Sequence, residues 1–295
     1  MEHLACTLAT ASLFAHCDSS YLETLYPNWG QAFAMQKIIF QEKTDYQDLV
    51  IFDNPTFGRV LALDGAIQVT EKDEPIYHEM MVHVPLFTFG TPASVLIIGG
   101  GDGGILREVL KHPSVKSATV VEIDPSVIEV SKRYLPTLSS GAFNDPRAHI
   151  LIEDASLFIK HSTDTFDVII CDSTDPFGPG AVLFTSEFYE DCKKRLHPKG
   201  IFVNQNGVPF LQNTEMSLTF KNRSPHFKYV SFYTASIPTY VGGMMVFGWA
   251  SDENYCISEK ELKKRSTLLQ PSMFYYTPQI HKAAFALPAY MEKAY

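Results

Sequence analysis

The sequence predicts an α/β protein in which a doubly wound, largely parallel sheet follows a small antiparallel β domain. Residues 94–98 form a short apolar run rich in branched side chains, as expected for a buried parallel strand. The run ends in the glycine-rich turn GGGDGG, and a helix-like pattern follows to residue 110. A second apolar run, residues 118–121, ends on the carboxylates Glu122 and Asp124. Strand, glycine turn, helix, strand and acid form the nucleotide-binding half of a Rossmann-like sheet.

The segment before this unit predicts the small β domain. The first two dozen residues have no strong pattern, and we expect a loosely attached extension there. Four apolar segments follow from residue 32, and Asp64-Gly65 between the last two is a hairpin signal. We therefore assign residues 1–74 to the extension and β domain, and residues 75–295 to the Rossmann-like domain.

Residues 74–86 predict a helix with Pro75 in its first turn. Its histidines, His78 and His83, raise the question of a metal site. They are five residues apart, about 500° around a helix, so the two imidazoles do not converge. We therefore expect no metal here. We interpret Tyr77 and His78 as polar groups that face a pocket; the alternative is that both side chains are buried and hydrogen-bonded within the core.

The alternation of strands and helices continues to a β-rich tail. Helices are expected at 125–134, 156–161 and 184–196, and strands at 149–152, 166–171 and 201–205. YVSFYTASIP and GGMMVFGWAS then predict an antiparallel pair of strands. Residues 176–184 form a loop rich in proline and glycine, which we interpret as a lid rather than a surface connection.

Composition narrows the function classes. The formal net charge of −9 disfavours nucleic acid and anionic membranes as partners. The five cysteines form no close-spaced pairs, which is typical of reduced thiols in a cytoplasmic protein. The sequence shows no basic start typical of a signal peptide and no apolar run of the roughly eighteen residues that a membrane span needs.

The glycine turn satisfies the dinucleotide pattern G-x-G-x-x-G through Gly99, Gly101 and Gly104. Asp102 argues against a dinucleotide, because a carboxylate inside the turn would face a pyrophosphate. A nucleoside with a positive centre, such as a sulfonium, turns that repulsion into attraction. We therefore expect a class I methyltransferase-like sheet, with an ordinary tight turn as the plain alternative.

Four strand ends in this domain carry an acid: Asp102, Glu122, Asp154, and Asp172 with Asp175. One acid after a strand is usually a helix cap, but four such ends meet at one edge of a parallel sheet. This indicates a crevice that binds cations. Glu122 and Asp154 suit a ribose and an adenine amino group, which leaves Asp102, Asp172 and Asp175 for amine-bearing substrates.

Together with these acids, motifs in order along most of the chain resemble the spermidine synthases, the polyamine aminopropyltransferase family. They extend from about residue 31 to residue 288: EKTDYQDLVIF, LDGAIQVTEKDEPIYHEMMVHVP, VLIIGGGDGGILREV, VEIDP, CDSTDPFGPG, FTSEFYEDC, IPTYVGGMM and AAFALP. The resemblance implies transfer of an aminopropyl group from decarboxylated S-adenosylmethionine to putrescine, giving spermidine and methylthioadenosine. It also implies a homodimer or homotetramer, with the nucleoside as a co-substrate and no cofactor.

The resemblance assigns roles to residues. Asp172 would be the general base. The nucleoside would be held by Gln47, Glu122, Asp154, Ala155 and Pro179, and the amine by Tyr77, His78, Asp102, Ser173, Thr174, Asp175, Gln205 and Tyr240. The family usually carries glycine where Ala155 stands, so we expect the adenine site to be slightly reshaped.

This chemistry fits the residues, because an ammonium must lose a proton before its nitrogen attacks carbon, and a carboxylate can accept it. Three alternatives stay open. They are a methyltransferase that acts on putrescine with ordinary S-adenosylmethionine, a non-catalytic polyamine-binding protein, and, least favoured because of Asp102, a nicotinamide dehydrogenase.

Overall fold

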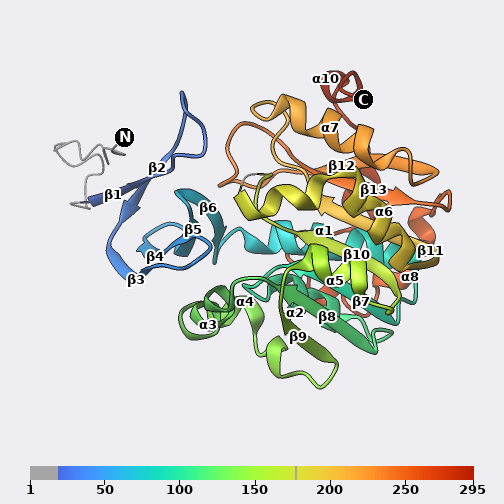
Figure 1. Ribbon diagram of the computed structural model, residues 1–295, viewed down its shortest axis with the longest axis horizontal. Helices are drawn as coiled ribbons and strands as arrows, with labels where there is room; N and C mark the ends of the chain where they lie inside the picture. Colours follow the sequence, from blue (N-terminus) through green and yellow to red (C-terminus); the bar gives the residue numbers. More distant parts are fainter. Residues whose placement is uncertain (1–18, 177) are drawn as a thin grey trace. The chain divides into compact units, whose positions relative to one another are not determined.

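The computed structural model describes residues 19–176 and 178–295, and the side chain of Pro179 lies outside that description. The chain divides into two units, Met1–Lys72 and Asp73–Tyr295. Figure 1 shows the strands of the first unit in blue and those of the second from green to red. Among the described residues, none of the helices is both long and apolar enough to cross a membrane.

The N-terminal unit is built from antiparallel strands. A hairpin, β1 (Ser19–Leu22) with β2 (Ala32–Met35), accompanies a four-stranded sheet in which neighbours in sequence pair. That sheet consists of β3 (Lys37–Lys43), β4 (Asp48–Asn54), β5 (Gly58–Leu63) and β6 (Ala66–Thr70). Its core is aromatic and branched, with Phe33, Phe52, Val60, Ala62 and Ile67 buried together.

Two expectations for this unit need correction. Residues 19–22 are not part of a loose extension, because they form β1 and pair with β2; residues 1–18 lie outside the described residues. The first expected apolar segment is two strands, β2 and β3, that meet at Gln36. The expected hairpin at Asp64-Gly65 is confirmed, since both residues have positive φ angles, 48° and 85°.

The C-terminal unit contains a seven-stranded sheet in the order β12-β13-β11-β10-β7-β8-β9. The five strands from β11 to β9 are parallel, and β13 joins them antiparallel to both β11 and β12. The bounds are β7 (Ser94–Gly99), β8 (Ser117–Glu122), β9 (Ala148–Ile152), β10 (Phe166–Asp172), β11 (Leu196–Gln205), β12 (Tyr229–Ala235) and β13 (Met245–Ser251). The predicted doubly wound fold is confirmed.

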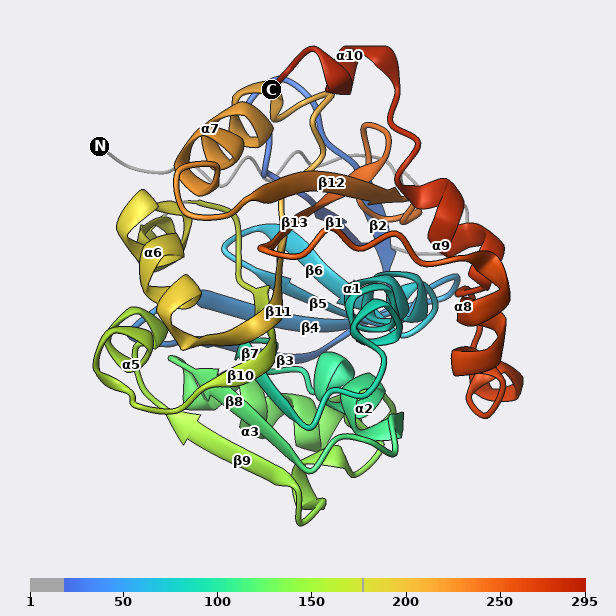
Figure 2. The same ribbon diagram turned by 90° about the vertical axis from the view of Figure 1, so that its right-hand side faces the viewer.

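Helices cover both faces of this sheet (Figure 2). One face carries α1 (Glu74–Phe89), α2 (Gly104–Lys111), α8 (Glu259–Ser266) and α9 (Pro278–Ala284); the other carries α5 (Ala155–His161), α6 (Ser186–Arg195) and α7 (Asn213–Arg223). Strand β7 is apolar on both sides: Val95 and Ile97 join the cluster around α1, while Leu96 and Ile98 join the cluster around α6. Both faces must be covered, which explains the uninterrupted apolar run in the sequence.

The remaining elements connect this framework. They are α3 (Pro125–Tyr134), α4 (Pro136–Ser139), α10 (Ala289–Glu292) and three short 3-10 helices, Ala142–Asn144, Gly178–Phe184 and Gln270–Ser272. The helix expected at 184–196 is α6 preceded by the second 3-10 helix, and β11 begins at Leu196 rather than at residue 201. The role of residues 176–184 as a lid stays a prediction.

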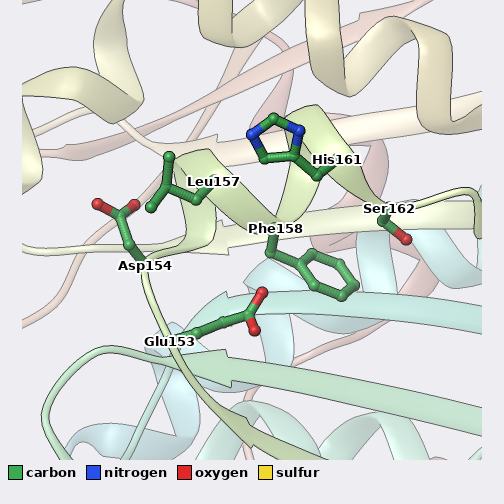
Figure 3. Close-up of a pocket in the computed structure, with 6 residues that line it drawn as sticks. All are labelled: Glu153, Asp154, Leu157, Phe158, His161 and Ser162. Carbon is green, nitrogen blue, oxygen red and sulfur yellow. The ribbon is translucent and has the colours of Figure 1, made fainter.

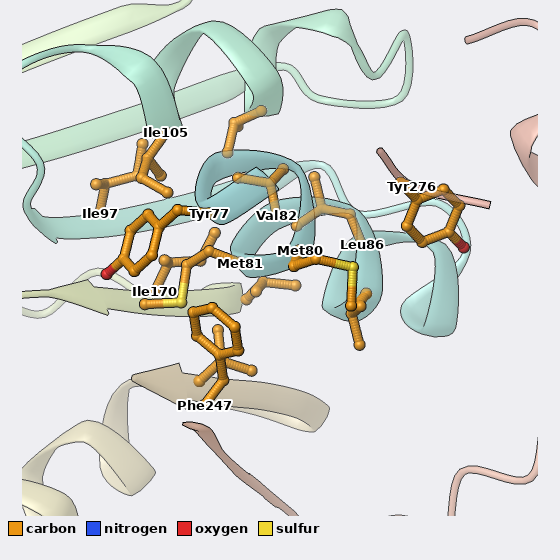
Figure 4. Close-up of a cluster of buried hydrophobic side chains, with 14 of the residues drawn as sticks. Tyr77, Met80, Met81, Val82, Leu86, Ile97, Ile105, Ile170, Phe247 and Tyr276 are labelled. Atoms are coloured by element: carbon orange, nitrogen blue, oxygen red, sulfur yellow. The ribbon is translucent and has the colours of Figure 1, made fainter. Parts of the chain in front are cut away.

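Helix α1 is the central element of the unit. Almost every one of its side chains is buried, so it has no polar stripe, and Figure 4 shows Met80, Met81 and Val82 inside the apolar cluster. The carboxylate of Glu79 accepts three backbone N–H groups, from Phe274, Tyr275 and Tyr276, at 2.6–2.8 Å. These contacts tie α1 to residues 274–276, and the first two turns of the helix supply Tyr77 and His78, which contact Asp172 and Asp102.

Candidate active site

The glycine turn after β7 lies directly against Asp172 at the end of β10. Gly99 is the strand partner of Asp172, and the N–H of Gly100 donates to the Asp172 carbonyl at 3.1 Å. The parallel pairing of β7 with β8 and β10 places the ends of three strands at one edge. The acids predicted to follow these strands are therefore neighbours.

Three glycines of this turn make room for the side chain or backbone of a candidate site residue. A Cβ at Gly99, whose φ is +75°, would lie 2.1 Å from the Asp172 carbonyl oxygen. A Cβ at Gly101 would lie 2.8 Å from Oε2 of Glu122, and one at Gly104 would lie 2.1 Å from Cε1 of His78. Close packing against these groups requires glycine at all three positions, and the positive φ of Gly99 favours glycine there as well.

Asp172 has the environment of a proton acceptor. The Tyr77 hydroxyl donates to Asp172 Oδ1 at 2.5 Å. Burial, with a smaller contribution from the negative charge of Asp102, raises the pKa of Asp172 to about 6, and His78 and the Tyr77 hydrogen bond oppose the rise. The carboxylate is thus ionised at neutral pH, yet is a stronger base than an ordinary aspartate.

Two tyrosines form one wall beside Asp172. The rings of Tyr77 and Tyr240 meet edge to face, with centroids 5.8 Å apart. Asp73 holds the segment of Tyr240 in place, since its Oδ2 accepts from the N–H and hydroxyl of Thr239 at 2.9 and 2.7 Å. Burial raises the pKa of both phenols well above the usual value, so both remain neutral.

Asp102 and His78 form an ion pair at the glycine turn. Asp102 Oδ1 accepts the N–H of Gly104 at 2.7 Å, and its Oδ2 lies 3.4 Å from His78 Nε2. The histidine and this N–H outweigh the effect of burial and lower the pKa of Asp102. Asp102 therefore presents a stable negative charge.

Residues 173–175 continue from β10 and meet the end of β11. The side chain of Gln205 donates to the Thr174 carbonyl at 3.2 Å and accepts from the N–H of Gly207 at 2.9 Å. Burial raises the pKa of Asp175, while hydrogen bonds with Gln212 and Gln205 oppose that rise. Ser173 lies between Asp172 and this network in the chain.

Glu122 ends β8, and Asp154 follows β9 at the start of α5. Glu122 is 8% exposed and accepts the N–H of Asp124 at 3.0 Å; burial raises its pKa to about 7. Asp154 caps α5 through the N–H and hydroxyl of Ser156, at 2.8 and 2.7 Å. The capping alternative thus holds for one oxygen of Asp154. Figure 3 shows its carboxylate beside an open pocket of about 400 Å³, lined by Glu153, Asp154, Leu157, Phe158, His161 and Ser162.

Three other residues were predicted to bind the nucleoside: Ala155, Gln47 and Pro179. Ala155 is the buried first residue of α5. Gln47 belongs to the N-terminal unit, in the connection between β3 and β4, where the Thr44 side chain accepts its N–H at 3.1 Å. The side chain of Pro179 lies outside the described part of the chain. The roles of all three stay predictions.

The histidines of α1 point to separate partners. His83 contacts Glu108 at 3.1 Å and His112 at 2.9 Å, whereas His78 contacts Glu74 and Asp102. Within residues 19–176 and 178–295 no group of three or more His, Cys, Asp or Glu side chains could hold a metal ion.

Glu74, which contacts His78, and Arg107, which contacts Glu74, were not among the predicted site residues. Glu74 and His78 are four residues apart on a predicted helix, and that spacing is a readable signal for a contact. Arg107 had no such signal, because it reaches Glu74 from α2.

Sequence comparison assigns both units to one family. The spermine/spermidine synthase domain matches residues 74–261, and the spermidine synthase tetramerisation domain matches residues 20–71. The chain belongs to the spermine/spermidine synthase family. Within this family it is a transferase, a polyamine aminopropyltransferase.

Relatives of the family are similar over almost the whole chain. The polyamine aminopropyltransferase of Klebsiella pneumoniae (strain 342) is 53% identical over 274 residues, which cover 92% of this chain and 96% of the relative. The protein of that name from Escherichia coli O139:H28 is 52% identical, covering 92% and 95%.

Solved structures of spermidine synthases share the fold. One, in complex with the transition-state analogue AdoDATO, is 39% identical with a TM-score of 0.89, covering 97% of this chain and 98% of its own. Another, from Thermotoga maritima, is 40% identical with a TM-score of 0.87, covering 94% of each chain.

Proposed function

We propose that this aminopropyltransferase uses decarboxylated S-adenosylmethionine as donor and putrescine as acceptor, giving spermidine and methylthioadenosine, with Asp172 as the general base. The observation that carries this proposal is the position of Asp172. It ends β10 against the glycine turn, receives the Tyr77 hydroxyl at 2.5 Å and has a raised pKa of about 6. A carboxylate of this kind can take a proton from an ammonium ion beside it.

The proposed reaction needs one proton transfer before substitution. The attacking ammonium of putrescine gives a proton to the Asp172 carboxylate, and its nitrogen lone pair becomes free. The nitrogen then attacks the methylene carbon bonded to the donor sulfur. The C–N bond forms, the C–S bond breaks, and sulfur keeps the electron pair as a neutral thioether. Because this leaving group needs no acid, the step requires no metal or redox cofactor.

The other predicted residues divide between the two substrates. Glu122 would bind the ribose hydroxyls, and the nucleoside would also contact Gln47, Asp154, Ala155 and Pro179. Asp102 would face the aminopropyl chain, while the acceptor would be held by Tyr77, Ser173, Thr174, Asp175, Gln205 and Tyr240. We further propose a homodimer or homotetramer in the cytoplasm, supported by the match to a tetramerisation domain and by the unpaired spacing of the cysteines.

Product analysis tests the proposal directly. The purified protein is incubated with putrescine and either decarboxylated or ordinary S-adenosylmethionine, and the products are identified by mass spectrometry. Spermidine and methylthioadenosine from the decarboxylated donor are expected. Methylputrescine from the ordinary donor would establish the methyltransferase, and binding of both substrates without product would establish a polyamine-binding protein.

Replacing Glu122 with glutamine should weaken binding of methylthioadenosine while stabilising the free enzyme at alkaline pH. A charge-assisted bond to the ribose contributes roughly 1.5–3 kcal/mol, so affinity should fall roughly 10- to 150-fold. The pKa of Glu122 in the folded protein, about 7, lies above its ordinary value of 4.5. The stability that the buried, protonated Glu122 carboxyl contributes is therefore fully present below about pH 4.5. It is lost as the pH rises through 7, where the carboxyl ionises inside the fold.

Glutamine has no charge to desolvate, and its amide oxygen can still accept the Asp124 N–H. At about pH 8 the free Glu122→Gln protein should thus have a free energy of unfolding higher than that of the wild type by up to roughly 3 kcal/mol. It should therefore unfold at a higher temperature. Calorimetric titration with methylthioadenosine and thermal unfolding measure the two effects. Unchanged affinity would remove Glu122 from the nucleoside site.

A further inference from the structure

The His78 ring is enclosed by two carboxylates. Its Nδ1 lies 2.5 Å from Glu74 Oε2, one turn earlier on α1, and its Nε2 lies 3.4 Å from Asp102 Oδ2 in the glycine turn. Only 2% of the residue is exposed. Both ring nitrogens therefore face acceptors, and neither is free to accept a proton from an amine.

Glu74 is itself held in place by Arg107 of α2. The two guanidinium NH groups donate to the two carboxylate oxygens, at 2.9 and 2.8 Å, and one of them also donates to the Leu138 carbonyl at 2.6 Å. This bidentate contact fixes the plane of the carboxylate and keeps it ionised. Beyond it, Arg107 Nε donates to Glu108 at 2.7 Å. Charges thus alternate from Glu108 through Arg107, Glu74 and His78 to Asp102.

A neutral imidazole does not fit this arrangement. It has one N–H and one lone pair, so one of the two carboxylates would face a lone pair inside a buried site. An imidazolium donates to both. We propose that Glu74 and Arg107 are positioning residues that hold His78 as an imidazolium, which in turn fixes Asp102 in the glycine turn. The role of Asp102 in this inference rests on the proposed function, whereas the state of His78 does not.

The surroundings of the ring agree with this assignment. Burial lowers the pKa of His78, but Asp102 and Glu74 outweigh burial and raise it to about 10. The other groups that face the ring are the edge of Tyr77, with centroids 5.6 Å apart, and the charge of Asp172. Gly104 contributes space, since a Cβ there would collide with the imidazole. In this inference His78, predicted from sequence to bind the amine, serves Asp102 instead.

The first test is histidine NMR on the free wild-type enzyme. The protein is labelled with ¹⁵N-histidine, and the His78 signals are assigned by their loss in His78→Gln. Both ring nitrogens should stay protonated from about pH 6 to about pH 9. An ordinary histidine loses one of these protons within that range. Titration of His78 with a midpoint near 6.5 would overturn the inference. No substrate is present, so this result is independent of the proposed reaction.

The second test separates Glu74 from a merely structural carboxylate. Glu74→Gln should lower the midpoint of His78 by roughly one to three pH units, because an opposite charge in contact is lost. Glu79→Gln is the matched control: Glu79 is also buried on α1 but binds the backbone of residues 274–276. Its variant should leave the His78 midpoint unchanged. Equal shifts in both variants, or a shift in neither, would remove Glu74 from the positioning role.

Kinetics provide a third readout. The His78 cation opposes the rise in the pKa of Asp172. His78→Gln should therefore move the acid limb of kcat/KM upward by roughly one pH unit. If His78 instead bound the amine through a free nitrogen, His78→Gln would raise the KM for putrescine and leave that limb in place. The latter result would overturn the inference.

Discussion

Replacing Asp172 with asparagine should abolish most turnover while leaving the nucleoside site intact. The amide cannot accept the proton of the attacking ammonium, and removal of a general base typically lowers the rate by about 10²–10⁴, or roughly 3–5 kcal/mol of barrier. The change is nearly isosteric, and the Tyr77 hydroxyl, which donates to Oδ1 at 2.5 Å, can donate equally to an amide oxygen. The loss should therefore appear in kcat rather than in folding.

The pH profile provides the internal check on this expectation. The pKa of Asp172 is raised to about 6, so kcat/KM of the wild type should fall below that pH as the carboxylate takes up a proton. The residual activity of Asp172→Asn should lack that acid limb. Initial rates measured across pH, with calorimetric titration of methylthioadenosine as the control for binding, test both points. Near-normal turnover of the variant at pH 8 would mean that another group is the base.

The fold was predictable because its signals are local and repeated. The run at Ser94–Gly99, the glycines after it and the periodic pattern of Gly104–Lys111 each indicate one element, and their order indicates a parallel sheet. Strand β1, Ser19–Leu22, escaped prediction because it is short and half polar, and its pairing with β2 spans a connection with no hairpin signal. Such a strand is defined by its partner rather than by its own sequence.

The candidate site was predictable to the extent that it follows from the sheet. Acids at the ends of parallel strands must meet, so the contact of Asp172 with the glycine turn could be expected. The ion pair of Glu74 with Arg107 could not, because these residues lie on two helices whose mutual packing depends on the whole core. That packing sets the surroundings of His78, whose two carboxylate partners, Glu74 and Asp102, were not expected from the sequence.

The second large effect that we expect is a preference of the enzyme for decarboxylated over ordinary S-adenosylmethionine, two donors that differ by one carboxylate. Ordinary S-adenosylmethionine carries this group on the chain that leaves the sulfur, where it would approach Asp102, and decarboxylation leaves only an ammonium. Two like charges about 4 Å apart repel by roughly 4 kcal/mol at an effective dielectric constant of 20. The His78 cation lies behind Asp102, roughly 8 Å from the donor carboxylate. Its attraction for that carboxylate offsets about 2 kcal/mol of the repulsion.

The decarboxylated donor should accordingly bind the wild type between about 30-fold and about 800-fold more tightly than the ordinary donor. In Asp102→Asn the repelling charge is gone, and the preference should fall to about tenfold or less, with Asp172 supplying the remainder. Competition binding of the two donors to both proteins measures this preference. Methylthioadenosine, which has no charged chain, is the matched control and should bind both proteins equally. Equal affinity of the wild type for the two donors would show that Asp102 does not face the chain, and would favour a methyltransferase with the same acids.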